Sequence, residues 1–306
     1  MTLTEESKTL IERITASSQL NILPQSYGGG RCFSKPFFGI SRGDDPLFEK
    51  FKEVIAVDHP TPAEIWTSNG LPDKDDLATE LRILSMVFPY SHEVRKAGEK
   101  NNGRLPAELT TIARNYSEEF INMILPKTVE FFIQKGFFAL APKLTPDYGY
   151  IRKDNPFAVY SNWSERHVAF VAGLGYFGFN NTLITKEGCS VILASVITDA
   201  PLSVTVRTID NPHNCLHYTS SKCEKCVTKC PSDALTKDGH QPEICLNYCT
   251  EVRSIIKELP IVKVLKKRYR KLNFESENHV VVSYPSGCTL CQFGVPCTDK
   301  DPLDII

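Results

Sequence analysis

Seven of the eleven cysteines in this chain stand in two arrays whose spacing is typical of thiolate ligands to iron–sulfur clusters. The arrays are Cys223-x2-Cys226-x3-Cys230-Pro231 and, after Cys245, Cys288-x2-Cys291-x5-Cys297. In a doubled run of this kind, the cysteine before the proline ligates the other cluster. The sequence therefore predicts a chain that carries electrons.

Each [4Fe–4S] cluster takes four thiolates, so one ligand must come from outside the arrays. Ser220 stands where the first array would have its first cysteine, and Cys215 is the natural replacement upstream. We assign cluster one to Cys215, Cys223, Cys226 and Cys297, and cluster two to Cys230, Cys245, Cys288 and Cys291. Cys249, four residues after Cys245 on an expected helical turn, competes for the place of Cys245. Cys32 and Cys189 lie far away in the sequence and are expected to be small buried apolar residues.

Paired Cys-x2-Cys motifs are also typical of zinc sites. A zinc ribbon would use two such pairs and stop at four ligands, which leaves four cysteines without a role: Cys215, Cys230, Cys245 and Cys297. Disulfides are not expected, because the sequence shows no secretory signal and no apolar segment near membrane-spanning length. We therefore expect a protein of the reducing cytosol that does not enter the membrane.

The composition sets limits on size and partners. With 306 residues, of which 42% are hydrophobic, the chain can bury a full core and make one large domain and a small one. Its net charge of −1 gives no overall attraction to nucleic acid or membrane. One basic run is an exception, and we interpret it as a solvated helix face rather than a docking patch: Lys263, Lys266, Lys267, Arg268, Arg270 and Lys271.

Helical and strand signals alternate before a domain boundary expected near residue 207. Residues 47–55 and 120–135 have helical patterns, and Gly136 ends the second. Residues 81–88 and 191–198 are apolar runs typical of buried strands, and the second suits a strand that is covered on both faces. The expected class is α/β (α+β). Residues 207–306 are cysteine-dominated, as in a ferredoxin-like module, with a basic helical insertion at about 251–271.

The segment Gly173-Leu174-Gly175-Tyr176-Phe177-Gly178 matches the dinucleotide-binding pattern G-x-G-x-x-G. That pattern must follow a strand and open a helix. Here Ser164 can cap the start of a helix that precedes the glycines, and Gly173 stands where the C′ glycine of that helix belongs. We therefore predict a helix-to-strand loop and no nicotinamide site. Glycines this dense still permit close approach of the backbone to a flat ligand.

Several motifs in order resemble the epoxyqueuosine reductase and reductive dehalogenase superfamily. They are Trp163-Ser164-Glu165-Arg166-His167-Val168-Ala169, the glycine loop, Leu183-Ile184-Thr185 and Thr198-Asp199-x-Pro201-Leu202, followed by the cysteine arrays. Together with Gly43-Asp44-Asp45-Pro46-Leu47-Phe48, they are most similar to the smaller anaerobic iron–sulfur proteins labelled epoxyqueuosine reductase-like. The resemblance covers most of the chain from about residue 36.

This resemblance implies a nitroreductase-like core over residues 1–206 that binds base-off cobalamin, fed by two [4Fe–4S] clusters in the C-terminal domain. The implied cobalamin-binding residues come from the glycine loop and the strand 191–198: Gly173, Leu174, Gly175, Gly178, Ala194, Ser195, Val196 and Thr198. Such a pocket would hold the corrinoid dry while a nearby acid protonates the reduced substrate.

The chain departs from the family at the proton donor. Epoxyqueuosine reductases carry a catalytic aspartate upstream of the glycine loop, but Val159 and Tyr160 stand near that place. Reductive dehalogenases use a tyrosine, so Tyr160 is the candidate here, with an ordinary tyrosine at a pocket edge as the alternative. Glu165, Arg166 and His167 are candidates for acid–base catalysis or substrate anchoring, or else for a helix first turn that complements the dipole.

Three functions stay open from the sequence. One is a cytosolic corrinoid-dependent reductase that acts on a small organic substrate, with ferredoxin or flavodoxin as electron donor. Another is an electron-transfer protein that reduces the corrinoid or metal centre of a partner protein. Epoxyqueuosine reduction in tRNA is the third, which the basic run would help and the missing aspartate would hurt. The N-terminus, with no twin-arginine signal, argues against respiratory dehalogenation.

Overall fold

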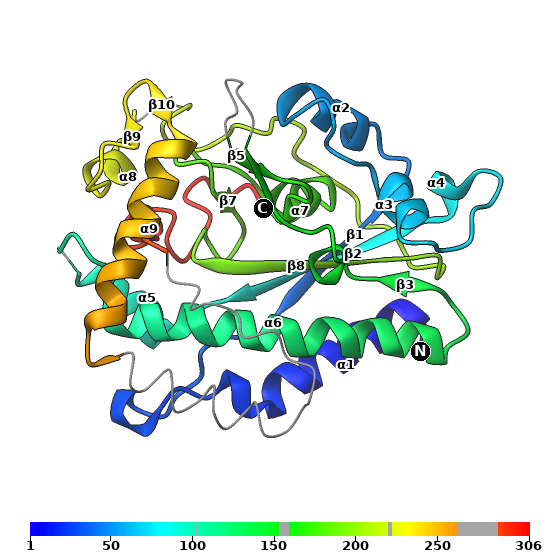
Figure 1. The fold of residues 1–306 in the computed structure, drawn as a ribbon, viewed down its shortest axis with the longest axis horizontal. Coiled ribbons are helices and arrows are strands. Elements are labelled where there is room, and N and C mark those ends of the chain that lie inside the picture. The colour runs from blue at the N-terminus through cyan, green and yellow to red at the C-terminus, as the bar shows by residue number, and fades with distance from the viewer. Residues whose placement is uncertain (102, 153–158, 220–221, 262–286) are drawn as a thin grey trace.

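The computed structural model describes residues 1–101, 103–152, 159–219, 222–261 and 287–306. Within these ranges, a sheet in the order β1-β2-β8-β3 forms the centre of the molecule (Figure 1). Its strands are β1 (Phe37–Arg42), β2 (Arg82–Pro89), β8 (Val191–Thr198) and β3 (Ala139–Leu140). Every neighbouring pair is antiparallel, so the mixed architecture is of the α+β kind.

The two inner strands are long and apolar because both of their faces are covered. Strand β2 pairs with β8 along its whole length, with Ser85 opposite Ser195 at the centre. Helix α6 (Glu108–Gln134) contacts β8 from one face, and α7 (Glu165–Val171) contacts it from the other. Both strand predictions, 81–88 and 191–198, are confirmed to within a residue.

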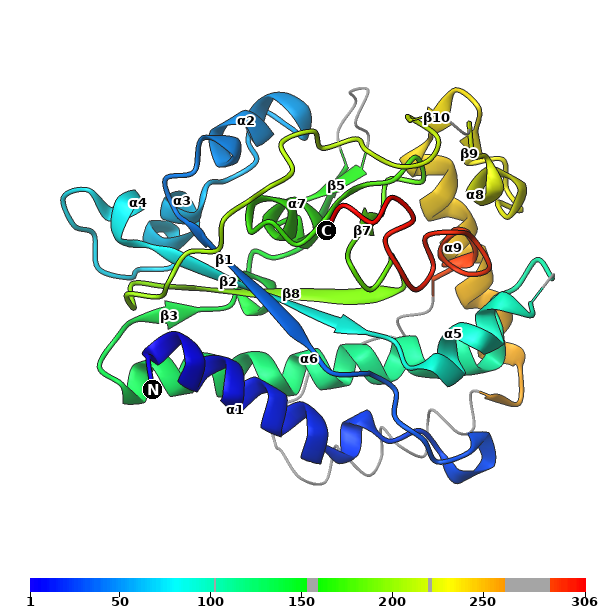
Figure 2. The same ribbon diagram turned by 180° about the vertical axis from the view of Figure 1, so that it is seen from behind.

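Helices lie on both sides of the sheet, as Figures 1 and 2 show. Helices α1 (Leu3–Ser17) and α6 share one side, and α2 (Pro46–Val54) and α7 share the other. The prediction for α2 is confirmed, with Asp45 as its N-cap. Helix α6 ends as predicted before Gly136, but it begins at Glu108, well before residue 120. Its first half contains weak helix formers such as Thr110, Thr111 and Asn115, whose burial in the core stabilises the helix instead.

The remaining elements connect these layers. The further helices are α3 (Pro62–Ser68), α4 (Leu77–Glu80), α5 (His92–Glu99), α8 (Lys225–Thr228) and α9 (Pro242–Glu258). Three short hairpins are β4 (Tyr150–Arg152) with β5 (Val159–Ser161), β6 (Tyr176–Phe177) with β7 (Leu183–Ile184), and β9 (Leu235–Thr236) with β10 (Gly239–His240). Short 3-10 turns span Gln19–Asn21, Gln25–Tyr27, Pro142–Leu144 and Leu290–Gln292.

The glycine loop has the helix-to-strand context that its sequence predicts. Gly173 has φ +73°, and its N–H bonds to the carbonyl of Phe170 while the N–H of Leu174 bonds to that of Ala169. This pattern is a Schellman motif, which ends α7 and turns the chain into β6. Ser164 is the N-cap residue of α7, but its hydroxyl contacts the ring of His167 rather than a backbone N–H.

The cysteine-rich region packs directly onto the rest of the chain. Tyr248 and Val252 of α9 belong to the same hydrophobic cluster as α6, and Cys215 and Cys226 pack with Ile184 of the β6–β7 hairpin. The sheet therefore ends before residue 207, while the apolar packing continues across that position. The basic run at 263–271 and most of the predicted insertion beyond α9 lie outside the described residues.

Candidate functional site

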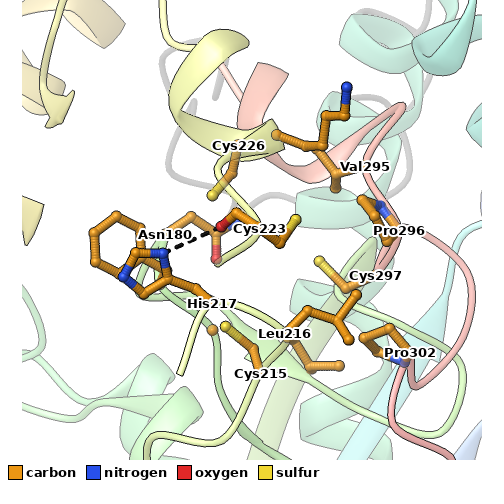
Figure 3. Close-up of a pocket in the computed structure, with 14 residues that line it drawn as sticks. Asn180, Cys215, Leu216, His217, Cys223, Cys226, Val295, Pro296, Cys297 and Pro302 are labelled. Carbon is orange, nitrogen blue, oxygen red and sulfur yellow. Dashed lines mark hydrogen bonds between the residues drawn. The ribbon is translucent and has the colours of Figure 1, made fainter. Parts of the chain in front are cut away.

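Four cysteines from three stretches of the chain line one pocket, and they are the set assigned to cluster one. Cys215, Cys223, Cys226 and Cys297 surround it, and Figure 3 shows their sulfur atoms turned toward a common space. The rest of the lining is largely apolar, with Ile184, Leu216, Val295 and Pro296 among its residues. A pocket of this kind excludes water from whatever the four thiols bind.

Burial affects the chemistry of these thiols. Desolvation raises the pKa of Cys226 to about 12 and also raises the pKa of Cys215. Thiols in such surroundings keep their protons near neutral pH unless a metal displaces them. The pocket therefore suits a site whose ligands become thiolates on binding iron.

The four cysteines of this pocket are arranged around a shared space. Among the residues that the structure describes, no three His, Cys, Asp or Glu side chains converge closely enough to hold one ion. A [4Fe–4S] cluster attaches each thiolate to a different iron atom, so its ligands surround a space instead of meeting at a point.

The cysteines assigned to cluster two also lie near one another. Desolvation raises the pKa of the Cys288 and Cys291 thiols, and Cys230 is close enough to both to raise the pKa further. The backbone N–H of Cys288 donates to Sγ of Cys249 at 3.5 Å, and Cys249 contacts the thiol of Cys245 one helical turn away. Both competitors therefore stand at this site, and the geometry leaves the choice between Cys245 and Cys249 open.

A much larger cavity of about 740 Å³ lies between the sheet and the cysteine-rich region. Residues of α2, α6, α7, the first half of β8 and both ends of the β6–β7 hairpin line it. All four side chains proposed for catalysis from the sequence line this cavity: Tyr160, Glu165, Arg166 and His167. Its volume lies within the range of small-molecule and cofactor sites, about 300–1,000 Å³.

Glu165 is a carboxyl group without a strong partner in this cavity. Neither carboxylate oxygen has a hydrogen bond of normal geometry, although Ser195 is close enough to favour the charged form slightly. Burial is the dominant effect and raises the pKa of Glu165 to about 7. A carboxylic acid that keeps its proton near neutral pH can act as a general acid.

His167 is held neutral between aromatic rings. Its ring lies 4.9 Å from that of Phe51 and 4.6 Å from that of Phe177, and its Nδ1 pairs with the Ser164 hydroxyl at 2.6 Å. Burial and then the nearby Arg166 hold its pKa well below the usual range. Arg166 itself donates to the backbone carbonyl of Asn181, which fixes it beside the β6–β7 hairpin.

No sequence motif indicates an acid beside Tyr160, but the fold supplies one. The Tyr160 hydroxyl donates a hydrogen bond of 2.6 Å to Oδ1 of Asp58. Asp58 is exposed, whereas Tyr160 is 7% exposed and lines the cavity. Next in the chain, the ring nitrogens of His59 are buried without hydrogen-bond partners, and burial lowers the pKa of His59 to about 4.

Other charged cavity residues were also missed from the sequence. Lys143 donates a hydrogen bond to Glu118 at 2.6 Å. Desolvation raises the pKa of Glu118, but the positive charges of Lys143 and Arg114 outweigh this effect and keep the pKa below its usual value. His213 and His240 line the same cavity from the region after β8. These residues follow no motif and are widely separated in sequence, so only the fold brings them together.

Most of the residues expected to bind cobalamin do not line this cavity. Of the residues proposed for cobalamin binding, Gly178 lines the cavity, whereas seven do not: Gly173, Leu174, Gly175, Ala194, Ser195, Val196 and Thr198. A Cβ on Gly175 would lie 2.2 Å from the carbonyl oxygen of Ile184, so that glycine allows tight hairpin packing. The cavity wall consists instead of Val191, Ile192 and Leu193 at the start of β8, together with Phe177 and Leu183.

The cysteine pocket and the large cavity share a wall. Gly178 and Phe179, in the turn of the β6–β7 hairpin, line both of them. A group bound in the pocket would therefore be separated from the cavity by one segment of chain. Fold and site together define an α+β chain with a thiol-lined pocket beside a cavity that contains acid–base groups.

Comparison with known proteins finds partial similarity to epoxyqueuosine reductases. Over 131 residues the chain is 32% identical to an epoxyqueuosine reductase of Lactococcus garvieae, covering 42% of this chain and 30% of the relative. Over 135 residues it is 32% identical to that of Listeria monocytogenes, covering 44% and 29%. The similarity agrees with the resemblance to epoxyqueuosine reductases that the sequence motifs carry. The match spans about 30% of the length of these curated relatives.

Solved structures of low sequence identity are also similar. Epoxyqueuosine reductase from Bacillus subtilis has a TM-score of 0.43 and 18% identity, covering 98% of this chain and 66% of the other. The catabolic reductive dehalogenase NpRdhA has a TM-score of 0.46 and 15% identity, covering 88% and 30%. No protein-family model matches the chain. Among the described residues, no helix is both long and apolar enough to cross a membrane.

Proposed function

We propose that the chain is a cytosolic reductase of the epoxyqueuosine reductase and reductive dehalogenase type. In this proposal two [4Fe–4S] clusters deliver electrons to the large cavity, where an organic substrate is reduced. The observation that carries the proposal is the wall of Gly178 and Phe179 that the thiol-lined pocket shares with the cavity. Ferredoxin or flavodoxin is the proposed electron donor.

The residues present fit the clusters. Cys215, Cys223, Cys226 and Cys297 surround one water-poor pocket and would hold cluster one. Cys230, Cys288 and Cys291, with Cys245 or Cys249, would hold cluster two. Such clusters supply single electrons at low potential.

The cavity also fits a bulky cofactor, and base-off cobalamin is the one that the family resemblance implies. Phe177, Leu183 and Val191 give it an apolar wall against which a flat ring system can pack. When bound, a corrinoid would supply a strongly reducing cobalt centre. A Cβ at Gly178 would lie 2.9 Å from Oδ1 of Asn180 and 3.0 Å from the side chain of Ile184, so this glycine allows the tight turn that forms part of the cavity wall.

The chain's own residues would provide protons and orientation. Glu165 carries its proton at pH values below about 7 and has no strong partner that competes for it. Tyr160 is a second donor, backed by Asp58. Lys143 and Arg166 add positive charge that can orient an anionic group of the substrate. The aromatic residues around His167 exclude water from the reacting centre.

The acid–base groups favour a reductase over a pure electron carrier. An electron carrier has no need for a cavity of about 740 Å³ lined by Glu165, Arg166 and His167. Action on tRNA is a narrower proposal, because a structural neighbour is an epoxyqueuosine reductase solved with a modified tRNA stem loop. That neighbour has a TM-score of 0.40, so we give a small organic substrate preference.

Anaerobic reconstitution tests this proposal at the level of cofactors. The full chain is reconstituted with iron and sulfide, and half of the sample also receives hydroxocobalamin. We expect about eight iron atoms per chain, which corresponds to two [4Fe–4S] clusters, and retention of cobalamin through gel filtration. Zinc at one or two atoms per chain would overturn the cluster assignment. Full iron without cobalamin would favour the electron-transfer function.

A further inference from the structure

Cys189 is a buried thiol that contacts one of the cysteines of the cysteine pocket. It is 2% exposed, as expected for a small apolar residue, but its Sγ lies 3.8 Å from Sγ of Cys297. Cys297 lines the cysteine pocket, whereas Cys189 lines the large cavity. The two thiols therefore touch across the boundary between the pocket and the cavity.

Backbone hydrogen bonds fix this contact. The N–H of Cys189 donates to the carbonyl of Cys297 at 2.7 Å, and the N–H of Ser190 donates to that of Thr298 at 3.1 Å. The Ser190 hydroxyl donates to the same Thr298 carbonyl at 2.6 Å. Gly188 allows the two segments to approach, because a Cβ there would lie 2.5 Å from the backbone of Thr298. The sulfur atoms thus face each other on two joined segments.

Cys189 stands outside the ring of four thiols. It does not line the cysteine pocket, whose four other cysteines would supply the four thiolates that one cluster takes. Its S–H has two acceptors in reach, Sγ of Cys297 at 3.8 Å and the carbonyl of Gln292 at 3.7 Å. Once Cys297 is a thiolate on iron, its sulfur carries negative charge and becomes the stronger acceptor.

We propose that Cys189 is a positioning residue whose thiol donates a hydrogen bond to the Cys297 sulfur of cluster one and raises the reduction potential of that cluster. This inference rests on the proposed function, because it requires a cluster in the cysteine pocket. The physical reason is that reduction adds negative charge to the cluster and its sulfurs. A donor beside one ligand sulfur stabilises the reduced state more than the oxidised state.

The position of the donor has a functional consequence. Cys189 acts from the cavity side, so it influences the cluster that lies across the Gly178 and Phe179 wall from the proposed reaction centre. Cluster two, whose ligands include Cys288 and Cys291, does not receive this hydrogen bond. The two clusters are therefore expected to differ in potential, with part of the difference dependent on one side chain.

Redox titration of reconstituted full-length variants, followed by electron paramagnetic resonance, tests the inference. Cys189→Ala is expected to keep the iron content of the wild type and to move the midpoint of one cluster to lower potential, while the other midpoint stays fixed. Cys189→Ser keeps a donor at this position and is expected to restore most of the shift. Cys32→Ala is the matched control, because Cys32 is also a buried thiol but donates to the carbonyl of Ala113.

The outcomes separate this inference from the proposed function. Unchanged midpoints in Cys189→Ala with full iron content would overturn the hydrogen-bond role. Loss of about half of the iron in that variant would overturn it in another way, because Cys189 would then be a ligand. Failure of the wild type itself to assemble clusters would overturn the proposed function, which the iron analysis shows before any titration.

Discussion

The hydroxyl of Tyr160 donates to Asp58, a residue 102 positions away in the sequence, across 2.6 Å. This hydrogen bond joins a residue of the cavity wall to a carboxylate at the protein surface. A proton that leaves Tyr160 toward the cavity could be replaced through Asp58 from the solvent. The pair thus offers a route for protons between the solvent and the cavity.

Removal of the Tyr160 hydroxyl should slow substrate reduction. We expect Tyr160→Phe to lower kcat by about a hundredfold, the usual contribution of a general acid, while iron content and cofactor binding stay unchanged. Asp58→Asn keeps an acceptor but removes the proton carrier, so a smaller loss of kcat is expected. Turnover is measured with reduced viologen as donor on small epoxides and aryl halides. Undiminished turnover of Tyr160→Phe would remove this residue from the mechanism.

Cys245 and Cys249 can be separated by mutation. Our prediction is that Cys245 ligates cluster two, so Cys245→Ala should lose one cluster and Cys249→Ala should keep the iron content of the wild type. The N–H of Cys288 donates to Sγ of Cys249, so this thiol also stands at the site and its variant tests the choice directly. Iron analysis and optical spectra of both variants give the answer. The reverse result would move the ligand by one helical turn, and equal losses would contradict the assignment of this segment.

Local sequence patterns predicted the elements around the site well. The strand 191–198 and the helix that begins after Ser164 follow from apolar runs and from a residue type that favours helix starts, signals that act over a few neighbouring positions. The cysteine spacing likewise indicated which thiols meet around one pocket, because Cys223 and Cys226 are held by the same short segment. The early start of α6 was missed, since tertiary burial and not propensity stabilises its first turns.

Contacts between distant segments could not be read from the sequence. Asp58 reaches Tyr160, and Cys189 reaches Cys297, only because the sheet and the C-terminal region bring separate loops together. The residues of β8 expected to bind a cofactor, Ser195 among them, do not line the cavity for a similar reason. Alternation along a strand predicts which residues share a face, but the position of the cavity depends on which side chains pack against that face. Trp163, for example, covers Ser195, because its ring N–H donates to the Ser195 hydroxyl at 2.9 Å.

The pH dependence of turnover should report on Glu165. Because burial raises its pKa to about 7, the carboxyl is protonated below that pH and loses its proton above it. A general acid must carry a proton, so kcat should be greatest below pH 7 and fall as pH rises through that value. Glu165→Gln should lower kcat and remove this alkaline limb. The Glu130→Gln variant, at an exposed position, serves as control. A wild-type kcat profile that stays flat from pH 6 to pH 8, roughly one unit on either side of that pKa, would contradict the assignment.

Buried His59 should make the folded state sensitive to mild acid. Burial lowers its pKa from the ordinary 6.5 to about 4, so between these values the unfolded chain binds a proton that the folded chain does not. The stabilisation is therefore fully present above about pH 6.5 and is lost as pH falls toward 4, by up to about 3 kcal/mol. His59→Phe removes the titrating ring, so the difference in unfolding free energy between this variant and the wild type should grow in favour of the variant from pH 7 to pH 5. Denaturant unfolding of the reconstituted proteins measures this difference, with both carrying the same clusters, and His92→Phe at the exposed start of α5 is the control. A difference that does not change with pH would show that His59 stays neutral in both states or is charged in both.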